Sequence, residues 1–175
     1  MKLKLVPIFF LVFGLFARFL PHPVNFAPIA AMALFSARYL PKKYAFILPL
    51  GIMFISDLFL GFYGPTMFFV YSSFILAGII GLISRHKKVS SFIPFASLSS
   101  SLIFFLVTNF GVWLTTTMYA KNLFGLQSCF IAAIPFFRNT LLSDLLYTIL
   151  FVGGYDLAFF LGKKFLSQKK FNLAF

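Results

Sequence analysis

The sequence predicts an all-α integral membrane protein with six transmembrane helices and with both termini in the cytoplasm. Hydrophobic residues make up 61% of the 175 positions and charged residues only 10%. A soluble domain of this length could not bury so much apolar surface. The apolar runs approach the roughly 20 residues that a helix needs to cross the hydrocarbon core, and cationic clusters separate them at regular intervals.

The six expected spans follow one another within a single domain that covers residues 1–175. Two short spans come first and flank the "PHP" segment at 21–23. The sixth follows an apolar outer segment, 126–137, in which "AAIP" predicts a bend. The expected ranges are 5–20, 24–39, 44–62, 66–84, 92–116 and 140–161.

The distribution of Lys and Arg predicts the orientation of these spans. Twelve of the 15 cations fall on one side, in the N-terminal segment, the loops after the second and fourth spans, and the C-terminal tail. They are Lys2, Lys4, Arg38, Lys42, Lys43, Arg85, Lys87, Lys88, Lys163, Lys164, Lys169 and Lys170. Cytoplasmic loops carry such an excess, so we expect a multi-pass protein of the cytoplasmic membrane whose partners include the lipid bilayer and no nucleic acid.

The basic, apolar N-terminal segment also fits a signal peptide. No small-x-small cleavage site follows it, and Arg18 comes directly after Ala17. We therefore expect an uncleaved first helix, with cleavage as the alternative.

A set of polar residues and one tryptophan is predicted to lie in the outer half of the membrane. Charged groups are costly there and commonly mark binding sites, although they also pair with one another. Either an ion-pair network or a ligand-lined cavity explains the set, and Asp57 is the natural partner for one arginine. Arg138 and Asp144, six positions apart, face different sides of one helix. The candidate solute-binding residues are Arg18, Asn25, Asp57, Asn109, Trp113, Arg138, Asn139 and Asp144.

The second span carries small residues four positions apart, the pairs Ala27 with Ala31 and Ala33 with Ala37. This spacing lets helices approach closely. It predicts either tight packing within the bundle or a docking face for another membrane subunit.

Four stretches, "RFLPHPVNFAPIAAMALF", "FILPLGIMFISDLFLG", "LVTNFGVWL" and "CFIAAIPFFRNTLLSDLLY", resemble a family of small bacterial membrane proteins without known function. That family is itself similar to the substrate-binding S components of energy-coupling factor transporters. The resemblance implies an S-component-like bundle in the bacterial inner membrane. It also implies capture of a vitamin or related micronutrient from outside, and a transmembrane coupling subunit with ATPases as partner. In S components the alanine motif lies on the first helix, whereas here it lies on the second.

Motifs for other functions are missing from the sequence. There is no phosphate-binding G-x-x-x-x-G-K-[ST], no H-E-x-x-H and no glutamate, and His22 and His86 fall on opposite sides. "GGYD" at 153–156 suggests an intramembrane aspartyl protease only faintly, because no second carboxylate is expected within reach of Asp156. Cys129 is expected to pack rather than to bind a metal. We therefore expect no enzyme, no metal and no cofactor, and the alternative to transport is an accessory subunit of a membrane assembly.

Overall fold

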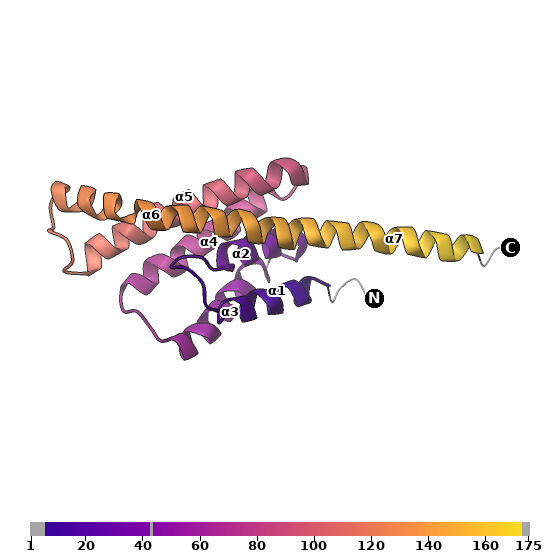
Figure 1. Cartoon of the computed structure of the whole chain (residues 1–175), viewed down its shortest axis with the longest axis horizontal. Coiled ribbons are helices and arrows are strands. Elements are labelled where there is room, and N and C mark those ends of the chain that lie inside the picture. Colours follow the sequence, from indigo (N-terminus) through magenta and orange to yellow (C-terminus); the bar gives the residue numbers. More distant parts are fainter. Residues whose placement is uncertain (1–5, 43, 173–175) are drawn as a thin grey trace.

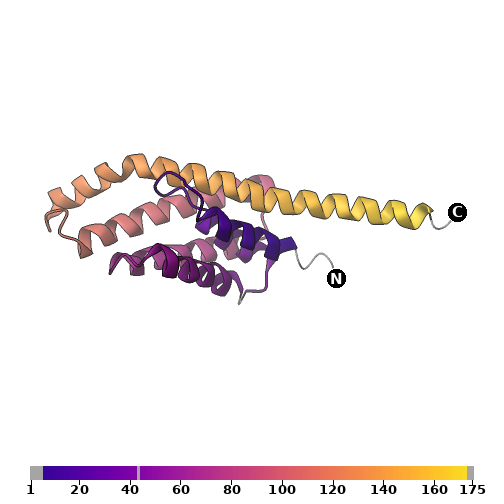
Figure 2. The same ribbon diagram turned by 60° about the horizontal axis from the view of Figure 1, so that its bottom comes forward.

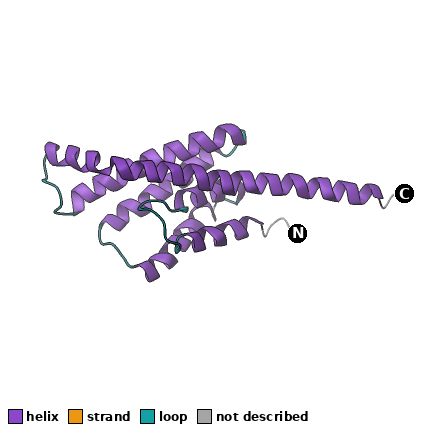
Figure 3. Cartoon of the chain, in the orientation of Figure 1, coloured by secondary structure: helices purple, strands orange, loops and turns teal. Residues whose placement is uncertain are grey.

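A computed structural model describes residues 6–42 and 44–172, and every regular element in those ranges is helical (Figure 3). The elements are α1 (Val6–Ala17), α2 (Ile29–Tyr39), α3 (Tyr44–Leu60), α4 (Thr66–Ser84), α5 (Val89–Thr115), α6 (Leu123–Thr148), the π-helical segment η2 (Ile149–Gly153) and α7 (Gly154–Asn172). The prediction of an all-α protein is confirmed for the described residues. Lys2, Lys4 and Lys43 lie outside them, as does residue 5, where the first predicted span begins.

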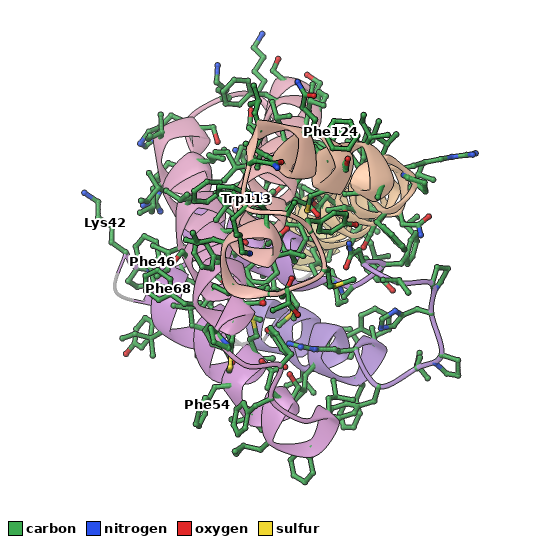
Figure 4. The ribbon with its side chains drawn as sticks, turned by 90° about the vertical axis from the view of Figure 1, so that its left-hand side faces the viewer. Lys42, Phe46, Phe54, Phe68, Trp113 and Phe124 are labelled. Atoms are coloured by element: carbon green, nitrogen blue, oxygen red, sulfur yellow. The ribbon has the colours of Figure 1, made fainter. Side chains whose placement is uncertain are left out.

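Three helices among the described residues are long and apolar enough to cross a membrane, namely Thr66–Ser84, Val89–Thr115 and Leu123–Lys163. Large apolar side chains cover the outside of the bundle, with Phe59, Phe68 and Phe124 each more than 70% exposed. Figure 4 shows Phe54, Phe68 and Phe124 pointing away from the bundle. Such a surface suits lipid rather than water.

The helices at the first two predicted spans are shorter than the expected ranges 5–20 and 24–39. α1 has 12 residues and α2 has 11, which corresponds to about 17–18 Å each at 1.5 Å per residue. The hydrocarbon core is about 30 Å thick, so neither helix crosses it alone. The segment 18–28 that joins them therefore lies inside the length of the bundle rather than at its end (Figure 1).

The helix that contains the sixth predicted span, 140–161, begins earlier than this span, at Leu123. α6, η2 and α7 form one uninterrupted helical run, in which Leu123–Lys163 alone has 41 residues. The helix continues through Pro135, and Figure 2 shows that α6 is bent rather than straight. Asn122 caps its beginning, because the Asn122 side chain accepts a hydrogen bond from the Gly125 amide at 2.8 Å. The run extends well past the other helices (Figure 1).

α2 is the central element of the bundle. Every residue from Ile29 to Ala37 is buried, and the helix contacts α1, α3, α4, α5, α6 and η2. Figure 1 places the beginning of α1 and the end of α7 on one side of the molecule, which we call the terminal end. The loops at 61–65 and 116–122 lie on the opposite side, which we call the loop end.

Side chains at the terminal end tie the helices together. The guanidinium of Arg38 donates to the carbonyl oxygens of Arg85 and Lys87 at 2.9 and 3.1 Å, and it lies 4.4 Å from the ring centroid of Phe92. Asp156 accepts a hydrogen bond of 2.8 Å from the Tyr39 hydroxyl. These contacts fix α2 against α4, α5 and α7.

Candidate solute cavity

A cavity of about 590 Å³ lies between segment 18–28, α2 and the four helices around it. Its volume falls within the roughly 300–1,000 Å³ of small-molecule sites. Its walls are largely apolar, with a few polar groups between them. The lining residues are Arg18, Phe19, Leu20, Pro21, His22, Asn25, Ala27, Ile29, Ala30, Met53, Leu60, Tyr63, Val70, Phe74, Phe104, Thr140 and Asp144.

One wall carries a buried ion pair. The Nη2 atom of Arg18 donates to Oδ1 of Asp57, and the Tyr71 hydroxyl donates to Oδ2 of Asp57 at 2.7 Å. Asp57 is only 1% exposed, so both carboxylate oxygens have a partner in a site shielded from water. The sequence argument that Asp57 pairs with an arginine is confirmed.

Asp144 lies on the α6 side of the cavity and is also 1% exposed. Its Oδ2 atom accepts a hydrogen bond of 2.6 Å from Ser101, and its main-chain carbonyl accepts one of 3.2 Å from Ser97. Within the described chain no arginine, lysine or histidine forms an ion pair with it. The two buried carboxylates of this region therefore differ: Asp57 has a cationic partner and Asp144 has only a hydroxyl.

Asp144 lies further from the loop end of the bundle than we expected for a residue near the start of the span 140–161. Ser97 and Ser101 follow the start of α5 by about 12–18 Å, on a helix about 40 Å long. Asp144 is therefore level with the half of α5 nearer the terminal end, not at the entrance of a span. The reason is the early start of α6 at Leu123, which puts more than twenty residues of helix ahead of Asp144.

The segment 18–28 is held against α6 by main-chain acceptors. The Asn139 amide donates to the Val24 carbonyl at 3.1 Å, and the Ser143 hydroxyl donates to the Ala27 carbonyl at 3.0 Å. Asn25 lines the cavity with a left-handed φ of 63°, a conformation that asparagine tolerates better than most residues. Asn139 thus positions the cavity wall without lining the cavity.

Three candidate residues from the sequence lie away from the cavity. The Asn109 amide donates to the Phe105 carbonyl one turn earlier on its own helix, at 2.7 Å. The Trp113 indole donates to the Ala120 carbonyl at 2.9 Å, and Lys121 donates to the Trp113 and Thr116 carbonyls, so these groups close the loop after α5. Arg138 is exposed on α6 and forms no hydrogen bond or ion pair within the described chain.

The alanine pairs pack within the chain. Ala31, Ala33 and Ala37 are 0% exposed, and Ala27 is half-buried and lines the cavity. A Cβ added at Gly81 of α4 would lie 2.6 Å from the Cβ of Ala37, which measures how closely α2 and α4 approach. Ala31, Ala33 and Ala37 are therefore covered by the bundle in this structure.

Sequence reasoning missed Tyr71 and Ser101, the two residues that donate to the buried carboxylates. Tyr71 was visible as a tyrosine well inside the fourth span, where a hydroxyl needs an acceptor. Ser101 was visible in "SLSSS", but its partner depends on the register between α5 and α6, which the sequence does not give.

The arrangement provides one largely apolar binding cavity with a single carboxyl group, that of Asp144, in its lining. Within the ranges 6–42 and 44–172, no group of three His, Cys, Asp or Glu side chains could hold a metal ion. The chemistry that the lining residues offer is hydrogen bonding and ion pairing to a bound molecule, with aromatic and aliphatic walls around it.

Fold and cavity together define a helical membrane protein with a small-molecule-sized cavity among its helices. Residues 2–168 match the model described as "Family of unknown function (DUF6580)", so the chain belongs to that family. Neither the curated proteins nor the solved structures contain a match to the chain.

Proposed function

We propose that this chain binds a small solute from the extracytoplasmic side of the bacterial cytoplasmic membrane and serves in its transport, as the S components of energy-coupling factor transporters do. The observation that carries the proposal is the cavity of about 590 Å³ with Arg18, Asn25 and Asp144 in its walls. A buried carboxylate without a cationic partner is costly in a membrane, and it is expected to be retained where it binds something.

The proposal includes six membrane crossings with both termini in the cytoplasm. It is supported by the cationic side chains Arg38, Arg85 and Lys87 at the terminal end, where the positive-inside rule favours the cytoplasm. In this orientation the solute enters the cavity from the outside. Delivery to the cytoplasm is assigned to a separate coupling subunit with ATPases, since the chain carries no nucleotide-binding motif.

Mass spectrometry of small molecules released from the purified protein tests the proposal. Ala27→Phe adds a ring to the cavity wall, whereas Ala158→Phe places the same ring on an exposed position of α7. A solute should be released from the wild type and from Ala158→Phe, and it should be absent from Ala27→Phe. If no molecule is released from any of the three, or if Ala27→Phe retains it, the cavity is not a solute site.

A second candidate function, an accessory subunit of a membrane assembly, is favoured by Arg138. This arginine is exposed on α6, between the exposed Phe136 and Leu142, and it has no ion-pair partner in the described chain. A cation on an apolar bundle surface is stabilised by an acidic group of a neighbouring subunit. If this function is correct, Arg138→Gln should release a membrane protein that co-purifies with the wild type in mild detergent, while Lys121→Gln should retain it.

A further inference from the structure

The charges around the cavity indicate the class of solute. Arg18 lines the cavity, but its positive charge is already matched by Asp57, which is also bound by Tyr71. Its second terminal nitrogen, Nη1, is enclosed by protein atoms and so does not reach a molecule in the cavity. The net charge that the Arg18–Asp57 pair presents to a ligand in the cavity is therefore close to zero.

Asp144 is the one carboxylate among the lining residues, and no cation compensates it within the described chain. One of its oxygens accepts from Ser101, and the other, Oδ1, has no hydrogen-bond donor there. Arg138 lies two positions before the lining residue Thr140, which turns it about 200° around α6 and away from the cavity. The wall thus carries one carboxyl group without a cationic partner and one oxygen free to accept a hydrogen bond.

Most of the other lining residues are apolar and favour a solute with an apolar body, although His22, Asn25, Tyr63 and Thr140 also line the cavity. Met53, Val70, Phe74 and Phe104 form walls from α3, α4 and α5, and Ile29 and Ala30 close the side of α2. A fully polar solute would lose its hydration against these side chains without replacement hydrogen bonds. An amphiphilic solute would lose little hydration energy on binding, provided that its polar group reaches Asp144.

We propose that the solute is a small organic cation, with a protonated amine that donates to Oδ1 of Asp144 and an aromatic or aliphatic body that packs against the adjacent rings of Phe74 and Phe104, whose centroids lie 5.3 Å apart. The inference rests on the proposed function, because it names the substrate class of the same cavity. Hydrogen bonds to a charged group contribute about 1.5–3 kcal/mol, so an amine should bind roughly tenfold or more tightly than an alcohol of the same shape.

Calorimetric titration of the purified protein with matched probes tests this inference. 2-Phenylethylamine, 2-phenylethanol and phenylacetate share one ring and differ in the charge of the end group, and the corresponding naphthyl series supplies a larger body. In both series the amine should bind at least tenfold more tightly than the alcohol, and the acid should bind most weakly. Equal affinity of amine and alcohol, tighter binding of the acid, or no binding by either series overturns the inference.

Two variants assign the preference to one side chain. Asp144→Asn keeps the shape of the side chain and removes its charge, so it should abolish the preference for the amine while leaving the alcohol unchanged. Asp156→Asn, the same substitution at a carboxylate bonded to Tyr39 about 18 Å further along the helix, should leave all affinities unchanged. A preference that survives in Asp144→Asn overturns the assignment. If Asp144→Asn does not fold, the comparison of probes on the wild type decides alone.

The outcomes separate this inference from the proposed function. A solute that is released from the wild type, is lost in Ala27→Phe and contains no protonated nitrogen would leave the function standing and refute the cationic class. Absence of both a released solute and a bound probe would refute both.

Discussion

Removing Arg18 should destabilise the protein more than the loss of any exposed cation. In Arg18→Met the aliphatic part of the side chain is kept, but Asp57, which is 1% exposed in the wild type, loses its cationic partner and keeps the hydrogen bond from Tyr71. Breaking a buried ion pair by removing one partner costs about 3–5 kcal/mol, because the remaining charge is left without compensation. Since the Arg18 side chain itself is only 12% exposed, we do not expect water to replace it fully.

The assay is the free energy of unfolding in mixed detergent micelles, measured for a double-mutant cycle. Arg18→Met should lose about 3–5 kcal/mol. Adding Asp57→Asn should restore part of this loss, because the uncompensated charge is then gone. The coupling energy between the two positions should exceed about 1 kcal/mol, within the range found for residues in contact.

Arg138→Met is the matched control, the same substitution at an exposed arginine without an ion pair in the described chain. Its effect should stay within about 0.5 kcal/mol, as for most surface substitutions. The reasoning is refuted if Arg18→Met and Arg138→Met cost the same, or if the effects of Arg18→Met and Asp57→Asn simply add.

Three further substitutions, one of them with a control substitution, test neighbouring contacts by the same unfolding measurement. Tyr71→Phe removes one charged hydrogen bond to Asp57 and should cost about 1.5–3 kcal/mol; a cost near zero would mean that water replaces the hydroxyl. Gly81→Ala forces a methyl group against α2 and should cost about 1–3 kcal/mol, whereas Gly51→Ala, with open space around its Cβ, should be neutral or slightly stabilising; equal effects would contradict the close approach. Ser101→Ala leaves one oxygen of a buried carboxylate without its donor and should cost about 1–3 kcal/mol; an unchanged stability would show that this hydrogen bond is not formed.

The sequence predicted the long apolar helices best. The span expected at 66–84 is α4, with the same ends, because Pro65 and the "SRHKK" segment mark its limits. The span expected at 92–116 differs from α5 by a few residues. The ends of the short helices α1 and α2 were harder to predict, because the apolar composition continues into segment 18–28 and the helices do not.

The start of α6 was missed because Pro135, Arg138 and Asn139 were taken as the boundary of a span. Asn122 carries the signal for the true start, since asparagine is among the preferred N-cap residues. Because of this error, Asp144 was predicted to lie near the start of a span. In the structure more than twenty residues of helix precede it, and it is buried beside Ser101.

The candidate site was predictable in composition and not in geometry. Intramembrane cost alone identifies Arg18, Asp57 and Asp144 as residues that need partners. The partner of each residue depends on how the helices are rotated and aligned against one another. A single sequence whose helices are apolar on all faces does not determine this. That is why Asn109, Arg138 and Asp144 looked equivalent in the sequence and have different surroundings in the structure.

Thiol labelling in intact cells tests the central claim, that the cavity receives its solute from the extracytoplasmic side. Leu20→Cys places a thiol on the exposed lining of the cavity, and Ser90→Cys places one at the exposed beginning of α5, both in a Cys129→Ala background. A membrane-impermeant maleimide should label Leu20→Cys in intact cells and Ser90→Cys only after permeabilisation. With the purified protein, the solute released from the wild type should slow the labelling of Leu20→Cys. Labelling of Leu20→Cys only after permeabilisation, or at a rate that the solute does not change, would contradict the account.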